Sequence, residues 1–479
     1  MANRDLEVLE LKPPTVNSCT INNSNNEITR LSITELSYND FYWQYMERNY
    51  PVILKDVSTQ WECRLNWLKA QTQDLTLTEK NDNKFEKPKV NSNIINYDYL
   101  REKIGNCQVP VANCNREYFN SHAKCEMLFY DFLRYWQEKQ KDLLATTTTT
   151  NLSNNDNKTT TTGDLLYLKD WHLKAQNAAY DFYKVPKYFA SDWLNEHLIA
   201  TKSDDYRFVY MGPKDTWTPF HSDVFGSFSW STNIMGIKKW LLLPPGEELK
   251  LSDHLGNLPF CINEEMLEKK YVKYFIIMQM ENESIFVPSG WHHQVWNITD
   301  TISVNHNWFN ACNLQRIWYN LNNQMEKVVK EIDDCRQMDN FVEHCQTMLR
   351  ASFGLNYLDF LQLLECIANR RLRQFNNNTT TTNVSTNSAI IPPPSHGMCS
   401  FDIDLTASTP LIFFDQFIPN DYHVRHDLER ILQVVELMLQ DSIICENRTV
   451  LYRKCIHLRE LLSTTALSLS LNEKISTSS

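Results

Sequence analysis

The chain has 479 residues, of which 42% are hydrophobic, 12% aromatic and 22% charged, with a formal net charge of −11. This composition is typical of a globular protein, and the length allows two or three domains with a core that needs no disulfide or structural metal. The acidic balance argues against a general nucleic-acid binder, whose surface would be basic. The 13 cysteines form no CxxC pair, so neither a zinc ribbon nor a thioredoxin-type redox site is supported.

The first residues, MANRDLEVLELKPP, lack the basic and apolar regions of a signal peptide. No apolar run approaches the ~18 residues that a transmembrane helix needs. We therefore expect a cytoplasmic protein without a membrane partner, with entry into the nucleus left open.

The first third of the chain is expected to be a mixed α/β region. Residues 1–28 are expected to be disordered and residues 29–145 to form an N-terminal α/β flank, in which SYNDFYWQYMERNY predicts a helix that begins at Ser37 and PVILKD a short buried strand. Residues 146–163 are rich in threonine and asparagine. Such a tract cannot bury enough apolar surface to offset its ordering entropy, so we expect a disordered insert.

The remaining chain divides into a β-rich and a helical part. Short β runs with Gly and Pro turns fill residues 164–313 and predict a sandwich or barrel. Residues 314–375 and 399–470 are expected to be helical, separated by a second disordered insert at 376–398 and followed by a loose tail at 471–479. A helical face begins this part, with apolar residues at Leu314, Ile317, Trp318, Leu321, Met325, Val328, Val329 and Ile332. The helices could form a homodimer or cap the β region.

A histidine and an aspartate lie two residues apart in TPFHSDVF, residues 218–225. If residues 221–234 form a strand, His221 and Asp223 point to one face, because side chains i and i+2 of a strand do so. That face would also carry Ser227, Ser229, Ser231 and Asn233. The pattern suits a metal and an organic acid, and it equally suits a strand whose polar residues satisfy one another.

A third metal ligand could come from the pair His292 and His293, which begin a strand after the turn Pro288-Ser289-Gly290. Two histidines and one carboxylate form the facial triad of non-heme Fe(II) oxygenases, which leaves positions open for a 2-oxo acid and O2. A structural zinc site would instead be closed by four protein ligands.

A cation for the far carboxylate of such an acid could be Lys238 or Lys239. The strand that follows His221 is expected to turn back at Met235-Gly236, so that IKKWLLLPP forms a hairpin with it. Only one of two adjacent lysines in a strand can point inward. A lysine that points outward would be an ordinary solvated residue.

The motifs TPFHSD, GIKKW, FVPSGWHHQVWN and TISVNHNWF, in this order, resemble the Jumonji-C family of Fe(II)/2-oxoglutarate oxygenases. The resemblance is dense from about residue 164 to 313 and thinner at 29–70 and 314–373. It implies a mainly β core with α elements, in which a double-stranded β-helix (cupin or jelly-roll) barrel has an N-terminal α/β flank and a C-terminal helical region. It also implies Fe(II) as the cofactor, with 2-oxoglutarate and O2 as cosubstrates.

The resemblance also implies roles for single residues. His221, Asp223 and His293 match the iron ligands, and His292 is expected in the pocket wall. The expected cosubstrate contacts are Lys238 for the distal carboxylate of 2-oxoglutarate, Thr218 and Tyr167 as hydroxyl donors to it, and Asn305 at a lining position where relatives carry threonine.

Within the family, the chain most resembles a lysyl hydroxylase of the eukaryotic translation-termination release factor. The resemblance implies that the protein hydroxylates a lysine side-chain carbon of that partner and so supports translation termination. Three alternatives stay open: a histone lysine demethylase, a hydroxylase of another residue type, and a catalytically silent scaffold. Nothing in the chain resembles the chromatin-reader modules that often accompany the demethylases.

Overall fold

The computed structural model describes residues 7–14, 27–70, 93–149, 163–201, 203–381, 417–445 and 450–476. Most of the segments that we expected to be disordered lie outside the described residues, namely 1–6, 15–26, 150–162, 382–398 and 477–479. The first part of the predicted helical segment 399–470, up to residue 416, lies outside them too.

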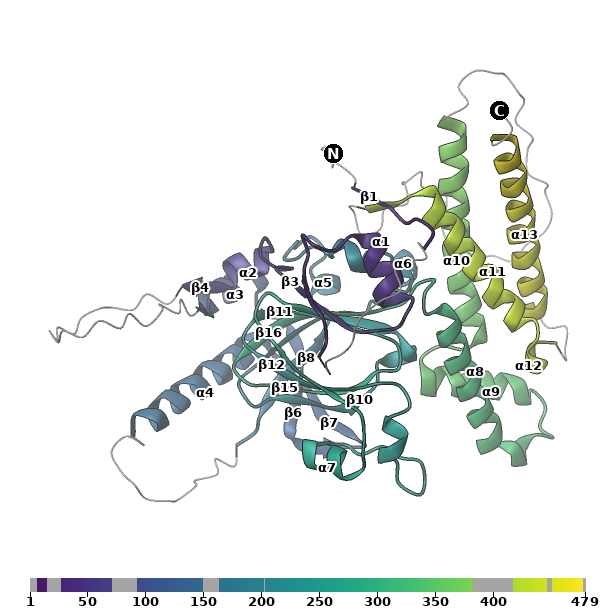
Figure 1. Cartoon of the computed structure of the whole chain (residues 1–479). Coiled ribbons are helices and arrows are strands. Elements are labelled where there is room, and N and C mark those ends of the chain that lie inside the picture. Colours follow the sequence, from purple (N-terminus) through teal and green to yellow (C-terminus); the bar gives the residue numbers. More distant parts are fainter. Residues whose placement is uncertain are drawn as a thin grey trace.

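The centre of the molecule is built from β-strands (Figure 1). In chain order they are β1 (Glu7–Leu9), β2 (Arg30–Ser32), β3 (Val52–Lys55), β4 (Leu68–Ala70), β5 (Asn93–Ile95), β6 (Gln108–Tyr118), β7 (Ser121–Leu128), β8 (Leu166–Trp171), β9 (Arg207–Gly212), β10 (Trp217–His221), β11 (Phe228–Met235), β12 (Lys238–Leu243), β13 (Phe275–Gln279), β14 (Ser284–Val287), β15 (His292–Asn297), β16 (Thr301–Trp308) and β17 (Phe417–Pro419). A larger sheet of nine strands has the order β2-β3-β14-β11-β16-β9-β8-β6-β7, and a smaller sheet of four has the order β10-β15-β12-β13.

Helices lie around these sheets and form the C-terminal part (Figure 1). They are α1 (Tyr38–Phe41), η1 (Tyr42–Met46), α2 (Glu62–Asn66), α3 (Tyr97–Ile104), α4 (Phe129–Thr149), α5 (Leu173–Gln176), η2 (Lys187–Phe189), α6 (Trp193–Ala200), η3 (Val224–Gly226), η4 (Glu248–Leu251), α7 (Glu264–Lys269), α8 (Leu314–Glu331), η5 (Asp333–Cys335), α9 (Phe341–Phe353), α10 (Tyr357–Thr381), α11 (Asp421–Met438), α12 (Ser442–Cys445) and α13 (Val450–Ser476). No helix among the described residues is long and apolar enough to cross a membrane.

The two sheets pack against each other through an apolar cluster at one end. The smaller sheet contributes Trp240 and Val295, and the larger sheet contributes Ile53 and Ile285. Beyond this cluster the inner face of the larger sheet becomes polar, because Ser231 of β11 lies opposite both Ile285 and Asn305 of β16. The space between the sheets therefore has an apolar end and a polar end.

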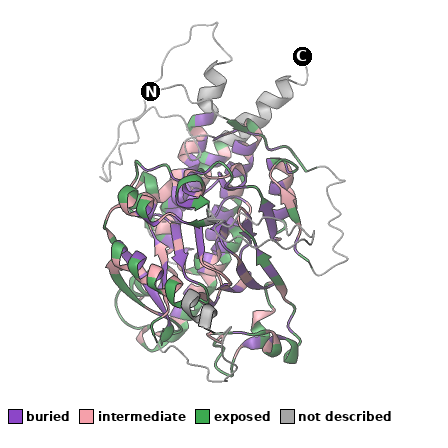
Figure 2. Cartoon of the chain, turned by 90° about the vertical axis from the view of Figure 1, so that its left-hand side faces the viewer, coloured by how far each residue is buried: buried purple, intermediate pink, exposed green. Residues whose placement is uncertain are grey.

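The outer face of the larger sheet belongs to a second hydrophobic cluster. Phe228 and Trp230 of β11 alternate with the inner serines and are fully buried in that cluster together with Phe41 of the N-terminal flank. Figure 2 shows the buried residues concentrated along the central strands. The prediction that Ser229 and Ser231 face inward while the aromatics pack outward agrees with this register.

These sheets confirm the predicted β core with α flanks in its coarse form. Apart from the parallel pair β2-β3, the ladders within the two sheets are antiparallel. Among the described residues no ladder joins the two sheets, so the core has the form of two packed sheets and a closed barrel is not seen.

The N-terminal flank begins as expected, since the Ser37 side chain caps α1 by accepting a hydrogen bond from the backbone of Asp40. The prediction that residues 1–28 are all disordered is wrong for residues 7–14. There β1 pairs with β17, and Leu9 and Leu11 are fully buried. This order depends on a partner strand some 400 residues away in the chain, which no local pattern reveals.

The C-terminal part is helical, as predicted. The apolar face of α8 is buried with side chains of α9, α10 and α11 in one cluster. Three boundaries of the predicted disordered segments need correction, because α4 continues to Thr149, α10 to Thr381 and α13 to Ser476. A polar tract can extend a helix that tertiary packing has already nucleated, since each further residue adds a hydrogen bond.

Candidate metal centre

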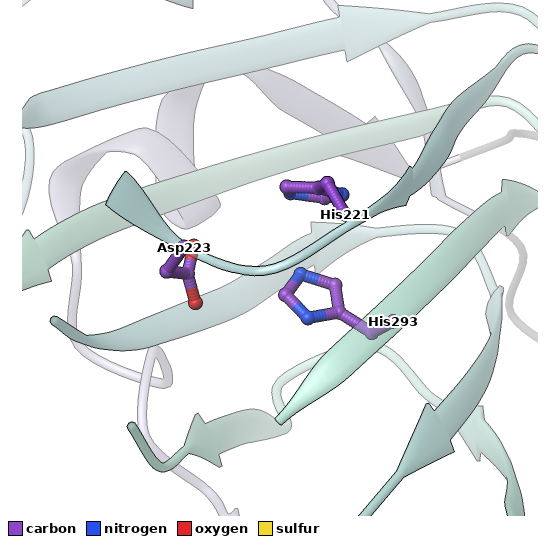
Figure 3. Close-up of side chains that lie close together, drawn as sticks. All are labelled: His221, Asp223 and His293. Atoms are coloured by element: carbon purple, nitrogen blue, oxygen red, sulfur yellow. The ribbon is translucent and has the colours of Figure 1, made fainter. Parts of the chain in front are cut away.

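His221 is the last residue of β10, and Asp223 follows two residues later. The expected continuous strand 221–234 is therefore wrong. Phe225 and Gly226 take positive φ angles of 61° and 69°, and the chain turns into β11 of the other sheet. Asp223 itself stays extended, with φ −63° and ψ 147°, so the two side chains still point into the same space (Figure 3).

His293 comes from β15, the neighbour of β10, and lies directly opposite His221 in the ladder. The centroids of the two imidazole rings are 4.4 Å apart. One ligand atom each of His221, Asp223 and His293 lie within 4.8 Å of one another, as a metal site requires. Figure 3 shows the three side chains converging from two neighbouring segments.

Backbone hydrogen bonds orient both imidazole rings. The Nδ1 atom of His221 lies 2.8 Å from the carbonyl oxygen of Pro219, and that of His293 lies 3.0 Å from the carbonyl oxygen of Trp291. A carbonyl can only accept, so each Nδ1 donates, and in the neutral ring Nε2 is then the nitrogen that can bind a metal. Burial, and next the neighbouring His293, lowers the pKa of His221 to about 3.

Two neutral donors orient the carboxylate of Asp223. The hydroxyl of Ser229 donates to Oδ2 at 2.7 Å, and the side-chain amide of Asn307 donates to Oδ1 at 2.8 Å. Sequence reasoning missed Asn307. It lies two residues after Asn305, so strand alternation could have identified it as a residue of the same face.

Lys238 lies inside the molecule, where its side chain is 2% exposed. Its Nζ donates to the hydroxyl of Tyr167 at 3.1 Å and to Oδ1 of Asn297 at 3.2 Å. Burial, and next the charge of Lys169, lowers the pKa of Lys238 to about 7. Lys239 points the other way and forms a salt bridge of 2.5 Å with Glu264.

The expected hairpin between β11 and β12 is wrong, because the two strands belong to different sheets. Lys238 reaches the site because β12 pairs with β15, the strand of His293. The chain crosses between the sheets at Gly236, whose φ is 82°, and a Cβ there would lie 2.0 Å from the backbone oxygen of Asp300. Glycine is thus required at this corner.

The other predicted residues lie on elements that border the same space. Thr218 is half-buried on β10, opposite Val295. Asn305 faces the same side of β16 as Asn307, and its amide donates to Ser303 at 3.1 Å. His292 alternates with His293 and points away, with its Nδ1 3.7 Å from the carboxylate of Glu248.

Known proteins are similar to this chain over most of its length. The family model described as "JmjC domain, hydroxylase" matches residues 208–308, and a JmjC domain implies a double-stranded β-helix, in agreement with the two packed sheets. Over 418 residues, the chain is 52% identical to the 2-oxoglutarate and iron-dependent oxygenase JMJD4 homolog of Drosophila melanogaster. This match covers 87% of the present chain and 89% of the relative. The chain is 36% identical over 418 residues to the JMJD4 oxygenase of Danio rerio, with 85% of each chain covered.

A more distant relative carries a different activity in its name. The arginine-specific demethylase JMJ20 of Arabidopsis thaliana is 35% identical over 356 residues, which cover 70% of this chain and 68% of the relative. The extent of the JMJD4 matches, together with the two histidines and one aspartate of the site, decides the assignment. The chain belongs to the JMJD4 family of JmjC oxygenases, which depend on iron and 2-oxoglutarate.

Proposed function

We propose that the protein hydroxylates a lysine side-chain carbon of the translation-termination release factor, with iron held by His221, Asp223 and His293. The observation that carries the metal assignment is the convergence of two imidazoles and one carboxylate within 4.8 Å. This donor set suits Fe(II) and leaves coordination positions for other ligands. The choice of substrate is supported by the motif resemblance, and a substrate of this kind places the reaction in the cytoplasm.

The protein residues bind and orient the reactants. Nε2 of each histidine and one oxygen of Asp223 would bind the iron, and Lys238 would bind the distal carboxylate of 2-oxoglutarate with Tyr167 beside it. Thr218 and Asn305 would line the same cosubstrate. When bound, iron and 2-oxoglutarate supply the oxidising power that inserts one oxygen atom from O2 into a C–H bond.

The test is mass spectrometry of the release factor after incubation with the purified protein, Fe(II), 2-oxoglutarate and O2. We expect one lysine to gain the mass of one oxygen atom, and we expect succinate to form in equal amount. The His221→Ala variant should give neither product. Full turnover by that variant would contradict the metal assignment.

N-demethylation is the second candidate, because the Arabidopsis relative is named as an arginine-specific demethylase. This reaction would use the same iron and 2-oxoglutarate to oxidise an N-methyl group. Methylated arginine and histone lysine peptides in the same assay would lose the mass of one methylene for each reaction. Loss of methylene from these peptides, with no oxygen gained by the release factor, would replace the proposed substrate.

A further inference from the structure

A row of three hydrogen bonds leads from the turn between β9 and β10 to the amine of Lys238. The row begins at Thr216, a fully buried residue of this turn. Its hydroxyl donates to the carbonyl oxygen of Pro213 at 2.6 Å. A carbonyl oxygen can only accept, so this bond takes the single hydroxyl proton of Thr216. Toward any other neighbour, the oxygen of Thr216 can therefore only accept.

Asn297 of β15 is the next member of the row. Its Nδ2 donates to Oγ1 of Thr216 at 2.7 Å, and its Oδ1 accepts from Nζ of Lys238 at 3.2 Å. The reverse orientation would place the amide oxygen against Thr216, which has no proton left, and an N–H group against the protonated amine of Lys238, which can only donate. Asn297 and Lys238 are each 2% exposed, so bulk water does not compete for these bonds. The amide of Asn297 thus has one favourable orientation.

Backbone pairing holds Asn297 between the turn and Lys238. The N–H of Asn297 donates to the carbonyl oxygen of Thr216 at 2.8 Å, and the N–H of Asp215 donates to the carbonyl oxygen of Asn297 at 2.8 Å. On its other side, Asn297 lies opposite Lys238 in the ladder between β15 and β12. The side chain of Asn297 therefore spans two backbone segments whose positions are fixed.

The second partner of Lys238, Tyr167, is held against the same turn. A Cβ on Gly212, the last residue of β9, would lie 2.5 Å from Cδ2 of Tyr167 and 2.7 Å from Oγ1 of Thr216. Any side chain at Gly212 would displace one of these two groups. Burial raises the pKa of Tyr167 above its ordinary value of 10.0, so its hydroxyl keeps its proton. Tyr167 accepts from Lys238 and can still donate that proton to a ligand.

These two acceptors leave one direction open at Lys238. A protonated amine has three N–H donors. Tyr167 accepts one of them at 3.1 Å, and Asn297 accepts another at 3.2 Å. The third N–H of Lys238 and the hydroxyl proton of Tyr167 are then available to a carboxylate, whose two oxygens can each accept one.

We propose that Asn297, oriented by Thr216, is a positioning residue for 2-oxoglutarate and directs the third N–H of Lys238 toward the distal carboxylate. The inference rests on the proposed function, which assigns that carboxylate to Lys238. Asn297 acts through Lys238 and does not itself bind the metal. Its effect is confined to ligands with a distal carboxylate, because a 2-oxo acid that ends in a methyl group offers Lys238 nothing to bind.

Two 2-oxo acids test this role. The protein is loaded with Mn(II) without O2, so that no turnover occurs. Calorimetry then gives the dissociation constants of 2-oxoglutarate and of 2-oxopentanoate, which lacks the distal carboxylate. We expect Asn297→Ala and Thr216→Val each to weaken 2-oxoglutarate by about 10-fold, through loss of a buried hydrogen bond, and to leave 2-oxopentanoate unchanged.

Matched variants separate the hydrogen bonds from the shape of the side chains. Thr216→Ser keeps the hydroxyl and should bind both ligands normally. Thr232→Val removes the hydroxyl of a fully buried threonine that has no hydrogen-bond partner among the described residues, and it should change neither affinity. Asn297→Asp keeps the size of the side chain but places a carboxylate against Lys238. This carboxylate competes with the ligand, so we expect 2-oxoglutarate alone to bind at least about 10-fold more weakly.

The outcomes are distinguishable. Unchanged affinity for 2-oxoglutarate in Asn297→Ala, or equal weakening of both ligands, would overturn the proposal. If Asn297→Ala folds poorly, equal affinities of Thr216→Val and Thr216→Ser for 2-oxoglutarate would overturn it instead. The Mn(II) stoichiometry of every variant is measured, and Lys238→Met is included. Absence of Mn(II) binding in the unsubstituted protein, or normal binding of 2-oxoglutarate by Lys238→Met, would contradict the proposed function itself. With both as expected, a failure concerns Asn297 alone.

Discussion

Two clusters in this molecule have nearly the same residue types and the same spacing. Each brings ligand atoms of histidine and aspartate within 4.8 Å of one another. The site cluster consists of His221, Asp223 and His293, and the peripheral cluster consists of His172, Asp204 and Asp205.

The clusters differ in what their neighbours supply. In the site cluster, the side chains that donate to the carboxylate are neutral serine and asparagine, and Nδ1 of each histidine donates to a backbone carbonyl. In the peripheral cluster, Arg207 binds the carboxylate of Asp205 at 2.6 Å, and Nδ1 of His172 lies 2.8 Å from the same carboxylate. The protein thus provides its own cation there, which leaves less need for a metal ion. Neighbouring charge, rather than residue type, separates a metal site from a salt-bridge network.

The sharpest test of this comparison removes one histidine from each cluster. His221→Ala should lower the metal affinity by more than about 100-fold, because loss of a direct ligand exceeds the effect of losing an outer-shell partner. His172→Ala should leave the metal content unchanged. The metal content of each variant after dialysis, measured by mass spectrometry, shows which cluster binds the metal. Equal loss of metal in both variants, or loss in His172→Ala alone, would refute the distinction.

The neutral neighbours of Asp223 provide the second test. Asn307→Ala removes the amide that orients Oδ1 and should weaken Mn(II) binding by about 10- to 100-fold. Asn305→Ala is a matched control, because Asn305 lies on the same strand face and donates to Ser303 instead. Titration with Mn(II) without 2-oxo acid, followed by electron paramagnetic resonance, measures the Mn(II) affinity of both variants. If Asn305→Ala were as damaging as Asn307→Ala, the orienting role of Asn307 would be wrong.

The buried amine of Lys238 in the site gives the third test. The pKa of Lys238 is about 7 when no ligand is bound, against an ordinary value of 10.5, because of burial and then Lys169. A bound carboxylate favours the charged amine and raises this pKa. Above pH 7 binding must therefore take up a proton, and we expect the dissociation constant of 2-oxoglutarate to rise about tenfold per pH unit.

Calorimetry between pH 6.5 and about pH 9 checks this dependence. The Lys238→Arg variant should lose the slope, because arginine stays protonated throughout this range. Lys239→Met should keep it, since Lys239 pairs with Glu264 outside the site. A flat profile in the unsubstituted protein would show that Lys238 is already charged before the ligand binds.

The sequence reveals those parts of the site that depend on short spacings. The separation of His221 and Asp223 and the position of His293 after a Pro-Gly turn are local, and the structure brings these three residues together although β10 ends at His221. The extended backbone of Asp223 preserves the relation between side chains i and i+2 after the ladder has ended.

The sequence does not reveal the strand order. A short connection that contains glycine is compatible with a hairpin and with a crossing between sheets, and for this reason the predicted pairing of β12 with β11 is wrong. Asn297 contacts Lys238 only because β12 pairs with β15.

The smallest effect is expected in the peripheral cluster, as a pH dependence of stability. The hydrogen bond that His172 donates to Asp205 raises the pKa of His172 above its ordinary value of 6.5. A raised pKa in the folded state means that protonated His172 adds stability below about pH 6.5. This contribution is lost as the pH rises through the folded-state pKa. The side chain is 32% exposed, so solvent screening limits the effect to about 1 kcal/mol or less.

Urea unfolding at about pH 5.5 and pH 8.5 measures this contribution against the His172→Gln variant. The loss of unfolding free energy on substitution should be larger at the lower pH. His254→Gln, in an exposed loop, serves as the control for loss of a histidine without an ion pair among the described residues. If His172→Gln destabilises the protein equally at both pH values, His172 binds Asp205 as a neutral ring. In that case Arg207 would be the residue that neutralises the carboxylate of Asp205 in the peripheral cluster.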